Sequence, residues 1–161
     1  MIRTEINDTE VQRAFAQVAA GLSNPTELMQ DAGEYLVNST KERFQEGRAP
    51  DGTPWAPKSQ TTLDQYLRSG DGALTRPLIG PSKTLSTTIN YAASDDSVEW
   101  GSNVIQAAVM QMGAQKGAFG SMANGSSIPW GNIPARPYLG VDEEDRDALF
   151  TITREWLEDL A

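Results

Sequence analysis

Residues 83–102, KTLSTTINYAASDDSVEWGS, carry the strongest β-structure signal in the chain. Apolar and polar side chains alternate from Leu85 through Tyr91 to Ala93, and a period of two is typical of a half-buried strand. The SDDS that follows favours a turn, because Asp and Ser side chains hydrogen-bond to their own backbone there. VEWGS at 98–102 fits a return strand, so the stretch predicts a β-hairpin.

Helical patterns lie on both sides of this hairpin. Residues 9–46 predict a short helix and then a long one, with a restart at 24–25 and an end at Gly47. Residues 103–113 favour a short helix, and residues 142–161 favour an amphipathic one. The apolar face expected on the first helix comprises Val11, Ala14, Phe15, Val18 and Leu22, and that on the last comprises Leu149, Ile152, Trp156 and Leu160.

Two long stretches have no periodicity. Residues 47–82 are rich in proline and residues 114–134 in Gly, Ser and Asn, so both are expected to be irregular arms. Short strands are expected at 2–6 and 136–141. These elements predict a single α+β domain over residues 1–161. We expect a small, mostly antiparallel sheet packed against long N-terminal helices and a C-terminal helix, with the two arms protruding.

The composition excludes several classes of site. The 161 residues include no cysteine and no histidine, which excludes disulfides, Cys or His metal ligands and a Ser-His-Asp triad. The formal net charge of −9 makes tight binding to DNA phosphates a poor expectation. No apolar run approaches the roughly 18 residues that suggest a membrane span, and the N-terminus lacks the apolar core of a signal peptide.

Clusters that could bind ligands have simpler explanations. The four acids at 142–145 favour a helix start, with Asp142 as cap, over a metal site. The acids at 95–96 fit a solvated turn better than a cation site. Gly113, Gly117 and Gly120 lack the strand–loop–helix context of a phosphate-binding loop. The sequence therefore predicts no catalytic residue, no cofactor and no metal.

Basic residues concentrate in the middle of the chain, over 41–76. They could form a nucleic-acid face, but the net charge favours solvated side chains or pairing with an acidic neighbouring subunit. These residues are Lys41, Arg43, Arg48, Lys58, Arg68 and Arg76.

Two tryptophans stand on proline-rich loops: Trp55 lies between Pro54 and Pro57, and Trp130 directly follows a proline. Each either folds back onto the core of its own chain or docks on a neighbouring subunit, and the two alternatives carry about equal weight. Arg136 is expected to pair with a carboxylate through its planar fork, either from 142–145 or from a neighbour. The predicted subunit or partner interface comprises Trp55, Pro54, Pro57, Trp130, Arg136, Pro137 and Tyr138.

Four motifs in this order resemble a known family. They are FQEGRAPDGTPWAPKSQTT at 44–62, LSTTINYAASDDSVEWGSN at 85–103, AAVMQMGAQ at 107–115 and IPARPYLGVDEEDRDAL at 133–149. Together they resemble the phage virion morphogenesis family, the tail completion proteins of P2-like and Mu-like phages. The chain departs from the family pattern at Met110, where members often carry histidine. This departure puts any role of that histidine in doubt here, but not the fold.

The resemblance implies a structural protein of the phage neck or tail end and no enzyme. It would form a homo-oligomeric ring, with six copies as the expectation, that completes or terminates the tail and allows head–tail joining. Its partners would be copies of itself and other neck and tail proteins, with DNA passing through the lumen without tight binding. It would be found in the virion, at the head–tail junction or tail end, after assembly in the host cytoplasm. A carboxylate-dependent hydrolase of the phage particle and a monomeric assembly chaperone of the tail are the alternatives.

Overall fold

The computed structural model describes residues 9–160 of the chain, and this part forms helices and one two-stranded sheet. The elements are α1 (Thr9–Leu22), α2 (Thr26–Glu46), α3 (Gln60–Ser69), α4 (Thr84–Thr87), β1 (Asn90–Ala93), β2 (Val98–Gly101), α5 (Ala107–Met112) and α6 (Glu143–Asp159). The predicted α+β class is confirmed. The strand predicted at 2–6 lies outside the described residues.

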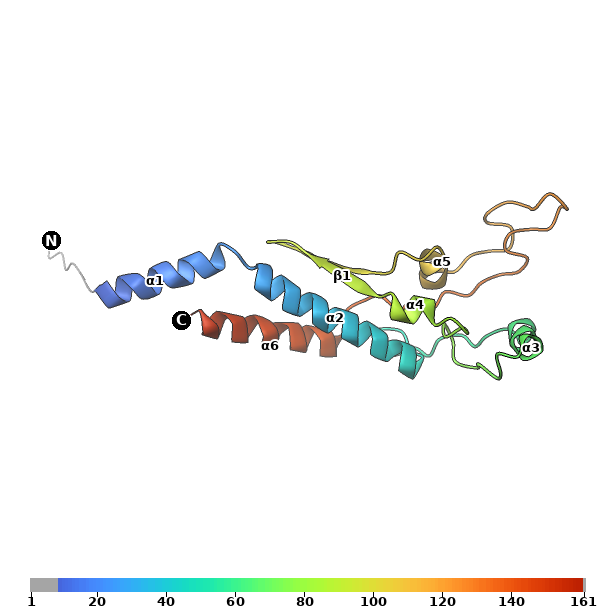
Figure 1. Ribbon diagram of the computed structural model, residues 1–161, viewed down its shortest axis with the longest axis horizontal. Helices are drawn as coiled ribbons and strands as arrows, with labels where there is room; N and C mark the ends of the chain where they lie inside the picture. The colour runs from blue at the N-terminus through green and yellow to red at the C-terminus, as the bar shows by residue number, and fades with distance from the viewer. Residues whose placement is uncertain (1–8, 161) are drawn as a thin grey trace.

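Helix α2 is the central element of an elongated molecule. The hairpin packs against one of its sides and α6 against the other, which makes three layers (Figure 1). Gly33 lies in the middle of α2 because a Cβ atom there would come within 2.3 Å of the Tyr91 ring in β1. This close approach outweighs the cost of about 1 kcal/mol that glycine brings to a helix interior relative to alanine.

The hairpin has the predicted turn. Tyr91 pairs with Trp100, and Ala93 pairs with Val98, in antiparallel register. In the turn, the Ser94 amide donates to the Ser97 carbonyl at 2.8 Å, and both serine hydroxyls lie within 3.0 Å of the Asp96 carboxylate. Hydrogen bonds from Ser94 and Ser97 lower the pKa of Asp96. The acids at 95–96 therefore belong to a self-contained turn.

The core lies at the C-terminal half of α2. Phe44 is fully buried there, and its ring meets Trp55 edge-on at 5.5 Å and Tyr138 at 5.3 Å. Ile79, Leu85 and other residues complete the same cluster from segments far apart in the chain. Both arms thus begin and end at one aromatic centre, which fixes where they leave the body.

Helix α1 stands apart from this core. None of its residues is buried, and Phe15 is 72% exposed. Its C-terminal end touches α6, because a Cβ atom on Gly21 would meet the Leu160 side chain at 2.2 Å. The expectation that both N-terminal helices cover the sheet is therefore wrong for α1, and only α2 does so.

Three element predictions are corrected. The strand predicted at 85–93 starts at Asn90, and residues 84–87 form α4 instead. The first arm contains a helix, α3, with Ser59 as its N-cap and Gly70 in the left-handed conformation as its C-cap. Residues 136–141 form no strand in the part of the chain described, and side chains bind their backbone instead.

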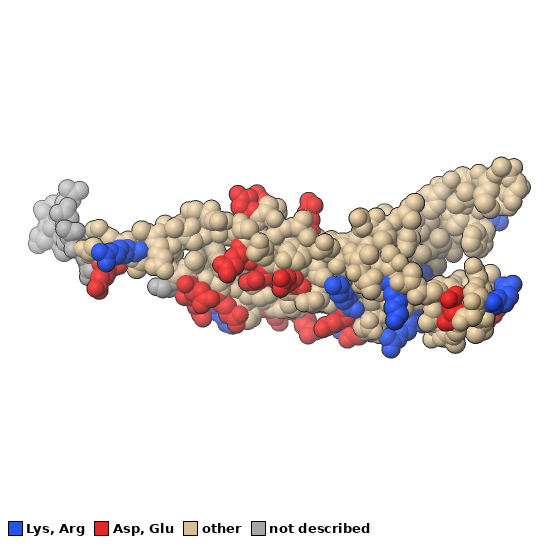
Figure 2. Space-filling model, viewed as in Figure 1, with Lys and Arg blue, Asp and Glu red and all other residues tan. Residues whose placement is uncertain are grey.

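Charge is divided unevenly between the helical body, which is α2 and α6, together with the hairpin, and the segments that include the two arms. Residues 26–47, 90–101 and 142–160 hold sixteen acidic and four basic side chains, whereas residues 48–83 and 102–141 hold three acidic and seven basic ones. On the face seen in Figure 2, acidic side chains gather over the middle of the molecule and basic ones toward the α3 end. The surplus of negative charge thus belongs to the helical body and the hairpin.

Candidate assembly surfaces

The proline-rich loop at 54–57 and the segment 136–141, which contains Pro137, are joined to each other. The Trp55 indole donates to the Pro137 carbonyl at 2.7 Å. The Arg136 guanidinium donates to the carbonyls of Ala56 and Pro57, at 2.7 and 2.8 Å. Prolines lack an amide hydrogen and cannot donate to the backbone hydrogen bonds of a sheet, so side-chain donors hold these two segments together.

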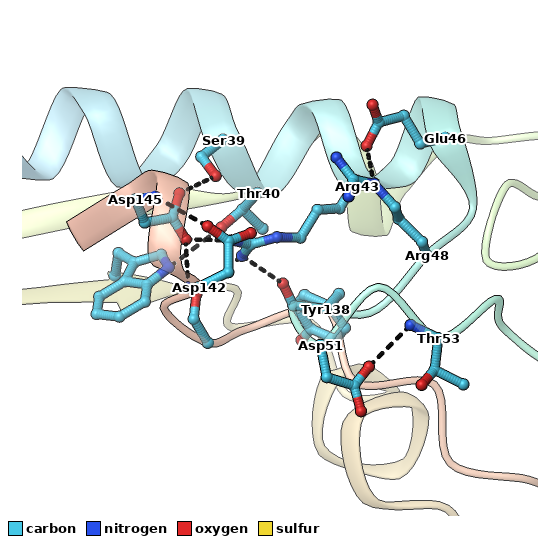
Figure 3. A network of polar contacts seen from close by, with 12 residues as sticks. Ser39, Thr40, Arg43, Glu46, Arg48, Asp51, Thr53, Tyr138, Asp142 and Asp145 are labelled. Carbon is cyan, nitrogen blue, oxygen red and sulfur yellow. Dashed lines mark hydrogen bonds and ion pairs between the residues drawn. The ribbon is translucent and has the colours of Figure 1, made fainter. Parts of the chain in front are cut away.

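A buried polar cluster holds the C-terminal end of the segment 136–141 against α2 (Figure 3). Arg43, 3% exposed, donates to the Gly140 carbonyl at 2.8 Å and pairs with Asp142 and Asp145. Asp145 also accepts from the Ser39 hydroxyl at 2.5 Å and from the Asp142 amide at 3.0 Å. Asp142 caps α6, as predicted, in a capping box with Asp145. Arg43 thereby fixes the start of α6.

The ionisation of this cluster follows from its contacts. Burial by itself raises the pKa of Asp145, but hydrogen bonds from Ser39 and the Asp142 backbone, together with the Arg43 charge, outweigh it and hold that pKa below its ordinary value. Burial, followed by the Asp145 charge, raises the pKa of Tyr35 to about 12. The carboxylate is therefore ionised and the phenol neutral near pH 7.

Helix α5 holds the same segment from the other side. Gln111 accepts from the amides of Tyr138 and Leu139, at 2.9 and 3.0 Å, and donates to the Leu139 carbonyl at 3.0 Å. The Arg136 amide donates to the Met110 carbonyl at 2.8 Å. Nothing in the sequence pattern singled out Gln111, because a lone glutamine on a short helix has no distinctive spacing.

The predicted interface residues divide into two sets. Trp55, Arg136 and Tyr138 are 5%, 7% and 1% exposed, so this chain already covers them with its own core. Trp130 is 76% exposed. The prolines at 54, 57 and 137 are exposed as well. A contact between copies through these residues remains a prediction. Of the three aromatic residues in the set, Trp130 is the exposed one.

The predicted pairing of Arg136 with the 142–145 acids is wrong. Its fork binds two carbonyl oxygens, whereas Asp142 and Asp145 pair with Arg43. The sequence places Arg43 among the basic residues of 41–76, whereas in the structure it is buried and paired with two acids. Arg43 and Asp145 are far apart in the sequence, and they meet only because α6 packs on α2.

Large apolar side chains are exposed at several places, among them α1, the 114–134 arm and α6. On α1, Val11, Phe15 and Leu22 are 41%, 72% and 53% exposed. On the 114–134 arm, the exposed set is Phe119, Met122, Ile128 and Trp130. On α6, Phe150 and Leu157 lie seven residues apart on one face, outside the stripe that packs on α2. The first two sets lie toward opposite ends of the molecule (Figure 1).

Residues 9–160 contain no cluster of three or more acidic side chains placed to hold a metal ion. No helix in the same range has the length and apolarity to cross a membrane. The exposed apolar side chains are instead candidates for contacts with other proteins.

The comparisons with known proteins support this direction. A family model, the phage virion morphogenesis family, matches residues 6–158, which is nearly the whole chain. The chain belongs to the phage virion morphogenesis family. The resemblance drawn from the four motifs is therefore confirmed. No curated protein and no solved structure matches the chain. As a member of this family, the chain has a role in phage virion assembly, which is a structural or assembly role.

Proposed function

We propose that the chain forms a homo-oligomeric ring at the phage neck or tail end, which completes or terminates the tail and allows head–tail joining. The observation that carries this proposal is the placement of exposed apolar side chains on α1 and on the 114–134 arm, toward opposite ends of the molecule. When one surface of a chain binds a different surface of the next copy, the contact is heterologous. Heterologous contacts close into a ring when the rotation between copies allows it.

The charge distribution fits a conduit for DNA. Most of the acidic side chains lie on α2, α6 and the hairpin and few on the arms, so a ring could present a net negative inner wall while the arms make contacts. Such a wall repels phosphates and provides no site at which the duplex would stop. Neighbouring neck and tail proteins would then bind the outer surfaces of the ring.

The first test is the mass of the particle in solution. Sedimentation equilibrium of the full chain is expected to give several times the 17.5 kDa monomer mass, with six copies as the expectation. A ring seen by electron microscopy would support the same assignment. A monomer at every concentration would favour the assembly chaperone instead.

The second test concerns head–tail joining. Particles assembled without this chain are expected to accumulate as separate heads and tails, and added purified chain is expected to join them. Joined particles in its absence would contradict the proposal. The hydrolase alternative predicts that replacing a catalytic carboxylate abolishes hydrolytic activity without any change in head–tail joining.

A further inference from the structure

A cleft lies beside the start of α6. Its volume is about 730 Å³, and residues 48–52 form one wall while 137–144 form the other. Pro50, Leu139 and Val141 contribute apolar side chains to its lining. Its charged lining includes Asp51 and Glu144, here called the acidic rim, and also Arg48, whose guanidinium already pairs with Glu46. No hydrogen bond or ion pair within residues 9–160 occupies the Glu144 carboxylate. The cleft therefore fits an apolar segment that carries positive charge.

The 114–134 arm has this chemistry. Phe119 and Trp130 are 58% and 76% exposed, and Lys116 is the one charged residue of the arm. No acidic residue occurs anywhere between 102 and 141. The Lys116 side chain makes no ion pair with any described residue. The arm is thus apolar and positively charged.

The arm is also formed before any contact. At its base, Ala114 and Ile133 exchange two backbone hydrogen bonds, and Gly113 lies so close to Ile133 that a Cβ atom would come within 2.7 Å of its carbonyl. Further out, the Phe119 amide donates to the Ile128 carbonyl at 2.8 Å. A segment already ordered by its own backbone loses little conformational entropy on binding.

We propose that the arm of one copy binds in the cleft of the next copy, with Trp130 in the apolar part and Lys116 beside the acidic rim. Within one chain the 114–134 arm extends away from α2 and α6 (Figure 1), so a contact between this arm and the start of α6 requires a second copy. The contact is heterologous, and each copy gives one arm and receives one. This inference rests on the proposed ring and names the segments that meet in it.

Disulfide trapping tests the contact directly, because the chain has no cysteine of its own. Gly131→Cys places a thiol beside Trp130 where a Cβ atom meets nothing within 4 Å, and Val141→Cys places one at the cleft. A disulfide needs Cα atoms within about 7 Å, so mixing these two single-cysteine chains under a mild copper–phenanthroline oxidant is expected to give a covalent dimer. Gly131→Cys mixed with Glu158→Cys, at the far end of α6, is the matched control and is expected to give little.

Charge reversal gives a second measurement. Lys116→Glu and Glu144→Lys are each expected to weaken self-association, and the chain carrying both changes is expected to regain it. Arg154→Glu, also exposed but outside the cleft, is the control for net charge. Trp130→Ala is expected to weaken association by about tenfold or more, the loss typical of an anchoring aromatic. Failure of the double reversal to restore association would overturn the pairing.

The outcomes separate this inference from the proposed function. A chain that oligomerises without the 131–141 cross-link leaves the ring standing and overturns the arm-in-cleft contact. A chain that stays monomeric and forms no cross-link contradicts both. If Trp130→Ala oligomerises normally but no longer joins heads to tails, the arm binds a different virion protein and the inference is wrong.

Discussion

Arg43 is the residue on which the packing of α6 depends. It is 3% exposed, and its partners Asp142 and Asp145 come from the other end of the chain. Asp145→Asn leaves the guanidinium buried with less charge compensation, and breaking a buried ion pair typically costs about 3–5 kcal/mol. We expect a loss of this size in urea unfolding. Glu143→Gln, which removes the exposed Arg146 pair on the same helix, is the control and should cost at most about 1 kcal/mol.

The same cluster sets a pH dependence of stability. The pKa of Asp145 is lower in the folded chain than the ordinary 3.8, so its contribution is present above that value and is lost as the pH falls through the folded pKa. The pKa of Tyr35 is raised from 10.0 to about 12, so its contribution is lost as the pH rises across that interval. Unfolding free energies measured across pH should show both losses. Asp145→Asn should flatten the acid limb and Tyr35→Phe the alkaline limb, and an unchanged profile in either variant would contradict the assignment.

The two tryptophans should separate folding from assembly. Trp55 is 5% exposed and packs on Phe44, so Trp55→Ala is expected to lower the free energy of unfolding by about 3–5 kcal/mol. Trp130 is 76% exposed, so Trp130→Ala should change it by no more than about 0.5 kcal/mol. Chemical unfolding of the two variants side by side measures this contrast. Equal losses would mean that Trp130 also packs within its own chain.

At the scale of elements, α1 is separable from the rest of the fold. None of its residues is buried, and an isolated helix of this length is marginal in water without tertiary packing. Deleting residues 1–20 is therefore expected to leave the thermal unfolding midpoint of the remainder nearly unchanged, because Gly21 and its contact with Leu160 are retained. Differential scanning calorimetry checks this, with deletion of 150–161 as the contrast. A collapse of the midpoint on removing α1 would show that it belongs to the core.

The missed elements have local physical reasons. Leu85 and Ile89 are four residues apart and both buried, a spacing that fits a helical turn as well as it fits alternation, so the pattern predicts a strand where the structure has α4. Helix α3 carried its own signals in Ser59 and Gly70, but the prolines just before it suggested an irregular arm. Residues 136–141 have strand-like composition, yet Gln111 and Arg43 bind their backbone in place of a neighbouring strand.

For the whole molecule, charge predicts weak contact with DNA. The net charge is −9, and the body and hairpin carry the acidic surplus. At about 0.15 M salt, where screening acts over roughly 8 Å, we expect no tight binding of duplex DNA in fluorescence anisotropy. Tight binding that weakens steeply with salt would mean that the basic side chains of 41–76 other than the buried Arg43 face DNA. The lumen would then have to be assigned to the arms rather than to the body.

Sequence by itself determined the α+β class, the hairpin, the long helix ending at Gly47, the Asp142 cap and the family. These depend on periodicity and on turn and cap residues, which act over a few neighbouring positions, and on the order of motifs, which is read directly from the sequence. Only the tertiary structure decided that Trp55 is core and Trp130 is surface, although both follow a proline. It also decided that Arg43, and not Arg136, pairs with the α6 acids. Burial and pairing depend on which distant segments meet, and that is settled by packing rather than by local preference.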